Sequence, residues 1–276
     1  MPLDQIDVVE QEQQLEQAGE MSFLDHLEEL RWRVIRALGA VVGVGILFFL
    51  FNQTLFDIVV MGPAQAEFIT YQWICQASEI LCFTPPEISM QAIGFGEAFI
   101  MSIKVSFILG FIVAFPYVFY QFWRFVKPGL YEKEQRVTRG VVIICSLLFV
   151  LGVSFGYFVI APFATNFLMG YTLPGVENIP TLSSYLGYMI MFTVPAGAIF
   201  ELPIVVYFLS KLGVVTPEFM RKYRRHSFVV ILLLAAMITP PDVFTQFLIG
   251  IPLYFLYEIS ILISARVNKQ EEEKLK

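Results

Sequence analysis

Charged side chains are scarce in this chain. Asp, Glu, Lys and Arg make up only 15% of its 276 residues, whereas 57% are hydrophobic and the mean hydropathy is +0.69. A typical soluble domain contains about 25% charged residues. The composition therefore excludes an ordinary soluble domain of this length and indicates an integral membrane protein, for which the lipid bilayer is the solvent.

Sequence motifs of catalysis and cofactor binding are also missing. The chain contains no G-x-x-x-x-G-K-[ST] phosphate loop, no H-E-x-x-H and no G-x-S-x-G, and its only histidines are His26 and His226. No nucleophile and base stand at a suitable spacing within a hydrophobic segment, so an intramembrane enzyme is the weakest alternative. We predict a protein that is not an enzyme, binds no nucleic acid and has no cofactor or metal site.

Cysteine is rare, and its spacing excludes a metal site. The three cysteines are Cys75, Cys82 and Cys145, and Cys145 stands inside a hydrophobic segment. Cys75 and Cys82 share a loop, where they form a disulfide if that loop faces an oxidising compartment or remain two unpaired thiols. The sequence leaves both alternatives open.

Basic residues are absent from the first 20 positions, which hold six acidic side chains. The whole chain has a net charge of −6, so the remainder carries 18 acidic and 18 basic residues and is neutral. The segment lacks the basic start and apolar core of a secretory signal. We expect residues 1–21 to form a disordered acidic tail, with Met21 as an alternative start.

Long hydrophobic runs are the main feature that the sequence does have. Crossing a hydrocarbon core of about 30 Å takes roughly 20 helical residues. Six runs qualify or come close: Ala37–Phe51, Ala98–Phe125, Gly140–Pro162, Tyr185–Ser210, Ser227–Ile238 and Val243–Ile263. We predict an all-α polytopic domain over residues 22–265 with six transmembrane helices, of which helices 5 and 6 are short. The fifth run would cover only about 18 Å, so a re-entrant segment remains the alternative.

The distribution of lysine and arginine predicts the orientation. These residues gather before the first run, between the second and third, between the fourth and fifth, and after the sixth, whereas loops 53–97 and 163–184 contain none. Basic residues collect on the cytoplasmic side of membrane proteins. We therefore expect both termini in the cytoplasm of a bacterium, residues 266–276 as a charged cytoplasmic tail, and the chain in the cytoplasmic (inner) membrane.

The segment SFLDHLEELRWRVIR, residues 22–36, is the first candidate site. Ser22 and Asp25 have the spacing of a capping box, which predicts the start of a short amphipathic helix. Glu29 and Arg33 then lie four residues apart on a polar face of that helix. Glu29 is either offered to a ligand or simply paired with Arg33 at the membrane surface, and the spacing alone favours the pair.

The second candidate site is YQFWRFVKPGLYEKEQR, residues 120–136. Pro128 and Gly129 end the second hydrophobic helix, and Glu132 and Glu134 follow among basic residues. Composition alone would make this an ordinary cytoplasmic loop in which the charges solvate one another.

Two ionisable residues lie within the hydrophobic runs. An ionisable group at bilayer depth costs about 3 kcal/mol or more, so such groups usually face a wet cavity or a partner. Glu201 stands well inside the fourth run, and we expect it to face a polar cavity rather than a structural ion pair. Lys104 is near enough to an end of its run to reach the interface with its long side chain.

Four segments resemble the signature stretches of the TatC family of twin-arginine protein translocases, in the same order. They are HLEELRWR (His26–Arg33), FPYVFYQFWRFVKPGLYEKE (Phe115–Glu134), FELPIVV (Phe200–Val206) and TPPDVFTQ (Thr239–Gln246). The resemblance covers nearly the whole chain after Met21. Residues 64–86 depart from the family pattern by enlarging the first external loop, and Gln135 stands where a basic residue is common.

The resemblance implies a receptor and specific roles for several residues. Glu29 and Glu134 would contact the paired arginines of a signal peptide, with Arg31 and Phe125 beside them. Glu201 would be the polar residue of a concave face. Gln246 and Met237 would belong to the surface that meets the single-span partner subunits TatA and TatB in an oligomeric complex.

Physical chemistry agrees with this hypothesis. Two fixed carboxylates can accept adjacent guanidinium groups bidentately, which lysine ammonium groups cannot match. Because no nucleotide site is present, export of folded cargo would draw on the proton-motive force. The competing hypothesis is a proton-coupled secondary transporter with Glu201 as the ion site and Lys104 as its counter-charge, but the chain has no internal repeat of the kind that builds such transporters.

Overall fold

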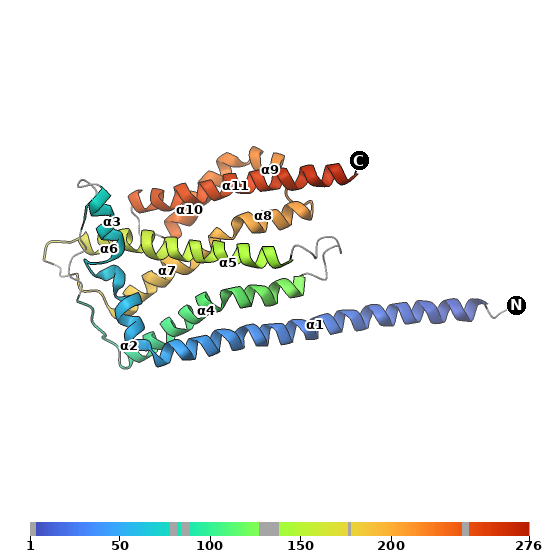
Figure 1. Ribbon diagram of the computed structural model, residues 1–276, viewed down its shortest axis with the longest axis horizontal. Coiled ribbons are helices and arrows are strands. Elements are labelled where there is room, and N and C mark those ends of the chain that lie inside the picture. Colours follow the sequence, from blue (N-terminus) through green and yellow to red (C-terminus); the bar gives the residue numbers. More distant parts are fainter. Residues whose placement is uncertain are drawn as a thin grey trace.

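The computed structural model is a bundle of long helices with both termini at one end (Figure 1). It describes residues 4–77, 82–83, 89–126, 138–175, 178–238 and 243–275, without the side chains at 4–26, 126, 138–139, 238, 243–244 and 271–275. Among these residues the elements are α1 (Asp4–Leu50), α2 (Asn52–Leu55), η1 (Phe56–Val60), η2 (Gly62–Ala64), α3 (Ile69–Ala77), α4 (Glu97–Val126), α5 (Thr138–Phe155), η5 (Gly156–Ile160), α6 (Ala161–Gly170), α7 (Leu182–Phe200), α8 (Leu202–Lys211), α9 (Pro217–Lys222), α10 (Arg224–Ile238) and α11 (Val243–Leu275).

The predicted membrane segments correspond to helices of the bundle. In the described part of the chain, five helical segments are long and apolar enough to span a bilayer: Leu27–Leu50, Glu97–Phe125, Gly140–Gly170, Leu182–Lys211 and Thr245–Gln270. The remaining predicted segment is α10, whose 15 residues cover only about 22 Å. The all-α polytopic fold is confirmed, and the shortness of the fifth helix has a structural counterpart in α10.

Two helices are longer than the sequence predicted. α11 continues past Ile263 to Leu275, because no proline or glycine follows Pro252 to stop it. α1 runs without a break from Asp4 to Leu50, so no separate helix begins at Ser22 and the backbone of most of the expected disordered tail is helical. The physical reason is composition: Glu, Gln, Leu and Ala favour helix, and the acidic count that suggested disorder does not oppose it.

Close contacts between helix backbones hold the bundle together. α1 packs along α4, where a Cβ on Gly110 would lie 2.8 Å from the backbone nitrogen of Gly45. α5 packs along α7, where a Cβ on Gly152 would lie 2.6 Å from the carbonyl oxygen of Ala196 and 2.8 Å from the Cα of Gly197. Small residues allow such approach in membranes, where dispersion contacts replace the hydrophobic effect between helices.

A cap of short elements, formed by α2, η1, η2 and α3, covers the end of the bundle remote from the termini (Figure 1). Tyrosine hydroxyls tie it down: Tyr157 donates to the carbonyl of Val59 at 2.6 Å, and Tyr185 to that of Val60 at 2.9 Å. Tyr71 of the cap is buried and donates to Pro63 at 2.7 Å. Burial raises the pKa of the Tyr71 phenol above its ordinary value, so the hydroxyl stays a donor.

The structure joins Cys75 and Cys82 in a disulfide, which is one of the two alternatives that the sequence left open. The bond closes a short loop that leaves the C-terminal end of α3. Cys145 is a free thiol buried on α5.

The glycine contact between α5 and α7 leads to a stability prediction. Gly152→Ala should lower the thermal midpoint in detergent, because the added Cβ collides with backbone and overpacking of this kind costs about 1–3 kcal/mol. Gly140→Ala is the matched control, since Gly140 also lies on α5 but has nothing within 4 Å of the added Cβ. Equal midpoints for the two variants would show that the contact does not hold the helices together.

Candidate functional site

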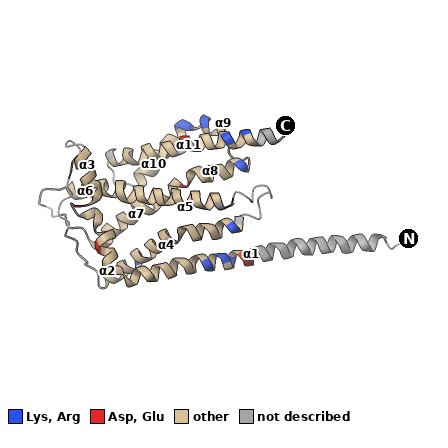
Figure 2. Ribbon diagram, in the orientation of Figure 1, with Lys and Arg blue, Asp and Glu red and all other residues tan. Residues whose placement is uncertain are grey.

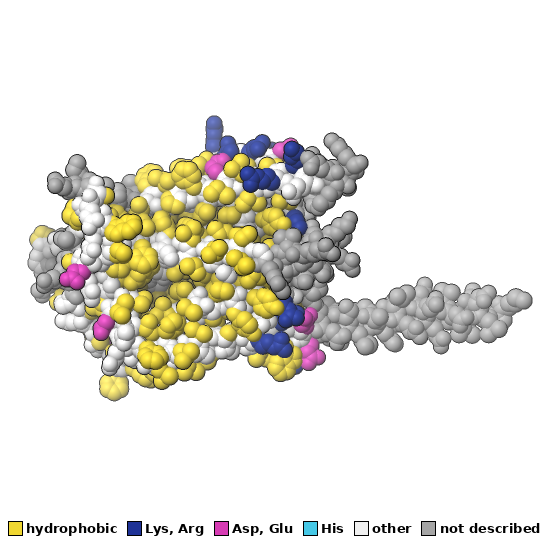
Figure 3. Space-filling view, in the orientation of Figure 1, with side chains coloured by type: hydrophobic (Ala, Val, Ile, Leu, Met, Phe, Trp, Pro, Cys, Tyr) yellow, Lys and Arg dark blue, Asp and Glu magenta, His cyan; other side chains and the backbone are white. Residues whose placement is uncertain are grey.

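The charged end of the bundle is where the candidate residues meet. Lys and Arg gather at the end that carries both termini, on α1, α4, α8, α9, α10 and α11 (Figure 2). On the face shown in Figure 3, the body of the molecule presents mostly hydrophobic side chains. This separation gives the bundle one charged end and one capped end.

Glu29 lies on α1 at the charged end and forms an ion pair with Arg33, one helical turn further along. The two partners differ in exposure: the Arg33 side chain is 9% exposed and that of Glu29 is 44% exposed. Arg33 is therefore held against the bundle while the Glu29 carboxylate reaches the surface. The pairing that the spacing favoured is present, and the burial of Arg33 is a feature that the sequence did not predict.

The antiparallel register of α1 and α4 places Phe125 level with Glu29. Gly45 meets Gly110, and Glu29 lies 16 residues before Gly45 while Phe125 lies 15 residues after Gly110. At 1.5 Å per residue both are about 23 Å from the contact, toward the same end. Arg31 is exposed on α1 and pairs with Glu28 at 3.1 Å. Three of the four predicted peptide-binding residues thus share one end of the bundle.

Glu134, the fourth predicted peptide-binding residue, lies outside the described residues together with Pro128, Gly129 and Glu132. The segment is flanked by the C-terminus of α4 and the N-terminus of α5, and both of these helix ends lie at the charged end of the bundle (Figure 1).

Glu201 stands at a break between two helices. It ends α7 and precedes α8, and Pro203 at the start of α8 lacks the N–H group that would continue the helix. Both carboxylate oxygens are buried and have no hydrogen-bond partner among the described residues. The Cys145 thiol of α5 lies beside this carboxylate and packs in one cluster with Trp123, whose indole nitrogen is also buried and unpartnered in the described structure.

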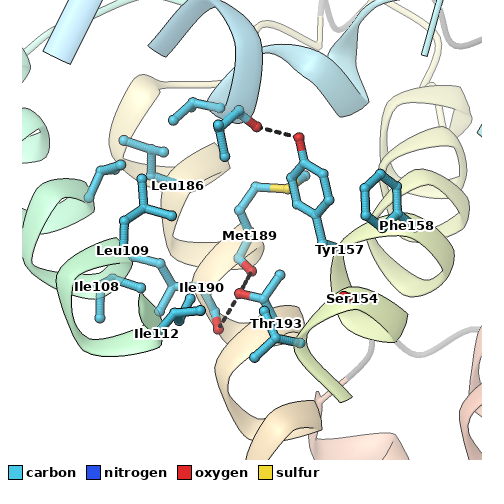
Figure 4. Close-up of a pocket in the computed structure, with 14 residues that line it drawn as sticks. Ile108, Leu109, Ile112, Ser154, Tyr157, Phe158, Leu186, Met189, Ile190 and Thr193 are labelled. Atoms are coloured by element: carbon cyan, nitrogen blue, oxygen red, sulfur yellow. Dashed lines mark hydrogen bonds between the residues drawn. The ribbon is translucent and has the colours of Figure 1, made fainter. Parts of the chain in front are cut away.

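The structure offers little support for a transporter site. Lys104 is exposed on α4 and forms no ion pair with Glu201 in the described part of the chain. An apolar cavity that reaches Val59 and Val60 of the cap has a volume of about 220 Å³ and is lined mainly by aliphatic side chains of α4 and α7 (Figure 4). The hydroxyl groups of Tyr157 and Thr193 in its lining donate to backbone carbonyls, and none of the residues that line it is charged.

The two predicted partner-binding residues lie on the last two helices. Met237 of α10 is 71% exposed. Gln246 of α11 donates from Nε2 to the carbonyl of Leu232 at 3.1 Å, so its amide joins α11 to α10 within the chain. The Gln246 side chain, which we expected at the surface that meets the partner subunits, thus also makes a hydrogen bond within the chain.

Sequence reasoning also missed Glu97 at the capped end. Its carboxylate accepts hydrogen bonds from the backbone N–H groups of Ile93 and Gly94 at 2.8 Å and of Ser183 at 2.9 Å. Ser183 is in the first turn of α7, where N–H groups lack helical partners. Glu97 therefore fastens the starts of α4 and α7 together, a role that its position before a hydrophobic run does not reveal.

Together these features define a polytopic membrane protein with a carboxylate presented at its charged surface and a second carboxylate buried at a helix break. The family model described as "Sec-independent protein translocase protein (TatC)" matches residues 25–252. The chain belongs to this TatC family, whose members are translocase components rather than enzymes. It is accordingly a multi-pass protein of the bacterial inner membrane.

Relatives and solved structures of the TatC family align with nearly the whole of this chain. The TatC protein of a Blattabacterium species is 36% identical over 263 residues, covering 92% of this chain and 98% of the relative. That of Desulforapulum autotrophicum is 39% identical over 258 residues, covering 91% and 86%. A crystal structure described as the twin-arginine translocase receptor TatC is 34% identical, with a TM-score of 0.65 over 88% of this chain and 99% of that one. A second crystal structure of this receptor, in DDM, gives a TM-score of 0.68.

The buried carboxylate at the helix break leads to a second prediction. Glu201→Gln should raise the thermal midpoint in detergent at neutral pH by about 2–4 °C, because it removes a charge with no described partner. Gln246→Leu should lower it, since that change breaks the bond to Leu232. A fall in stability for Glu201→Gln would mean that the carboxylate has a partner that stabilises it.

Proposed function

We propose that this chain is the core receptor subunit of a twin-arginine translocation system, which binds twin-arginine signal peptides and organises the export of folded proteins. Membership of the TatC family and the likeness to structures described as the twin-arginine translocase receptor support the proposal. The observation that carries the site is the position of Glu29, an exposed carboxylate at the charged end of the bundle. In this proposal Glu29 and Glu134 receive the paired arginines, with Arg31 and Phe125 beside them.

The ion pair with Arg33 is compatible with ligand binding at Glu29. A carboxylate has about four lone-pair positions on two oxygens, so it can accept from Arg33 and from an incoming guanidinium together. Arg33 is held by its burial against the bundle, and it fixes the direction in which Glu29 points. Arg33 is thus a positioning residue. Because it orients the Glu29 carboxylate before the ligand binds, less side-chain conformational entropy is lost on binding.

A pair of carboxylates favours adjacent arginines over lysines. The guanidinium group is planar and presents N–H donors in a fork that matches a carboxylate, whereas an ammonium group is a compact charge without that geometry. Contacts at the membrane surface are partly screened, and each is worth about 1 kcal/mol or less. The apolar part of the signal peptide therefore adds affinity by lying along the helices.

The partner subunits in this proposal are the single-span proteins TatA and TatB. They meet α10 and α11, whose lipid-facing side chains are large and exposed: Leu233, Met237, Phe247, Ile251 and Phe255. Both termini lie in the cytoplasm, because the basic residues gather at the end where the termini lie and basic residues mark the cytoplasmic side. The proton-motive force supplies the energy for passage.

The receptor site is tested by neutralising its carboxylates. Glu29→Gln and Glu134→Gln should each weaken binding of a twin-arginine signal peptide by about fivefold, the factor that about 1 kcal/mol represents. Export of a twin-arginine reporter protein should fall along with the binding affinity. Glu28→Gln is the matched control, because Glu28 is a more exposed neighbour on α1 that pairs with Arg31.

Photocrosslinking of a labelled signal peptide measures the same site directly. Adducts should map to the charged end of α1 and α4 and be lost in the Glu29 variant. Undiminished binding and export in both glutamine variants would refute the assignment of the receptor site while leaving the family membership untouched.

The proposed orientation is tested with a thiol reagent that does not cross membranes. Added to intact cells after mild reduction, it should label Cys75 and Cys82, because their disulfide lies at the capped end that we place outside the cytoplasm. Cys145 is buried and should stay unlabelled. Labelling of Cys75 and Cys82 only after the cells are opened would reverse the orientation.

A further inference from the structure

A basic pocket lies at the charged end of the bundle, on α9, α10 and α11 and away from the Glu29 site on α1 (Figure 1). It has a volume of about 860 Å³, and its lining consists of Arg221, Lys222, Arg224, Arg225, His226, Phe228 and Tyr254. Four of these seven side chains are permanently cationic. The proposed signal-peptide site does not use any of them, and a ligand that carries paired arginines is repelled by this pocket.

One of the cations is neutralised within the chain and the others are not. Arg224 pairs with Glu258 of α11 at 2.7 Å, and Tyr254 donates to the other oxygen of that carboxylate at 3.0 Å. Between described residues, no ion pair joins Arg221, Lys222 or Arg225 to an acidic side chain. The bond to Glu258 therefore fixes one wall of the pocket, and three positive charges without an acidic partner among the described side chains remain to attract an anion.

The pocket opens where the charged end borders the lipid-facing surface. Phe228 lies four residues after Arg224, about 6 Å further along α10. From there the next exposed side chains of α10 are apolar, namely Phe228, Val229 and Val230, and they precede the α10 residues proposed to meet TatA and TatB. Figure 3 shows the same border, with Lys and Arg at the end of the bundle beside hydrophobic surface.

We propose that this pocket binds the phosphate headgroup of an anionic phospholipid, with its acyl chains beginning along Phe228, Val229 and Val230 of α10, next to the surface proposed to meet TatA and TatB. Arg221, Lys222 and Arg225 supply the charge, and the fork of each guanidinium matches phosphate oxygens. Basic pockets between membrane helices on the cytoplasmic side suit such headgroups. The continuous apolar surface below the pocket favours a lipid over free phosphate, which has no apolar part to place there.

The proposal is tested by titrating the purified full chain with phosphatidylglycerol or phosphatidylcholine and counting bound lipids by native mass spectrometry. Phosphatidylglycerol should bind more tightly than phosphatidylcholine. The double variant Arg221→Gln with Arg225→Gln should weaken phosphatidylglycerol binding by roughly 30-fold, at about one fivefold step for each lost charge. Phosphatidylcholine binding should not change.

Two further variants separate a specific pocket from general attraction. Arg36→Gln with Arg266→Gln removes the same charge from exposed positions of the same end outside the pocket, and it should cost less than about threefold. Arg221→Lys with Arg225→Lys keeps the charge but loses the guanidinium forks, so its affinity for phosphatidylglycerol should lie between those of the unchanged chain and the glutamine variant, which also shows that the pocket tolerates substitution without unfolding.

Three results would overturn the proposal. One is an equal loss in the pocket variant and in the control variant, which would leave only nonspecific attraction. Another is equal binding of phosphatidylcholine. The third is displacement of the lipid by millimolar inorganic phosphate, or by an acidic peptide, as effectively as by phosphatidylglycerol, which would assign the pocket to a soluble anion.

Discussion

The arrangement of charged residues in this bundle depends on the free-energy cost of placing an ionised group in the hydrocarbon core of a bilayer. Because an ionisable group at bilayer depth costs about 3 kcal/mol or more, charged residues concentrate at the ends of the helices and the body between them is apolar. Recognition of a charged peptide can then occur only at an end. Glu201 is the exception, and it lies where Pro203 has already interrupted the helix and beside the Cys145 thiol.

The charged end is itself divided. Glu29 lies on α1, whereas the basic pocket lies on α9, α10 and α11, and Figure 2 shows α1 and α9 at opposite sides of the bundle. The width of the bundle separates a surface that attracts guanidinium groups from one that attracts phosphate. A receptor arranged in this way can hold a cationic peptide and an anionic lipid at once, because neither ligand competes for the charges that bind the other.

Hydropathy and the positions of Lys and Arg predicted much of the fold, because membrane helices are set by length and composition alone. Hydropathy and charge could not predict features that depend on how residues distant in the sequence are placed in space. The glycine contacts of Gly110 and Gly152 depend on the partner helix, and the Cys75 to Cys82 bond depends on how their loop turns. The acidic composition of residues 4–20 suggested disorder, although those residue types also form helix.

At the candidate site the sequence predicted the spacing of Glu29 and Arg33 but not which of them is buried. Burial of Arg33 depends on the residues that pack around it in three dimensions, which no local pattern encodes. The family resemblance assigns Gln246 to the partner-binding surface, which stays a prediction, and its hydrogen bond to Leu232 is a contact that the sequence did not predict. The role of Glu134 remains a prediction that comes from the family resemblance.

The packing of α1 has a mechanical consequence. This helix touches the bundle mainly along α4, and only 11% of its membrane segment is buried. The close approach at Gly45 and Gly110 lies about 24 Å along α1 from Glu29. A tilt of α1 by about 10° about this contact would displace the Glu29 end by about 4 Å, and the burial of Arg33 one turn from Glu29 opposes that displacement.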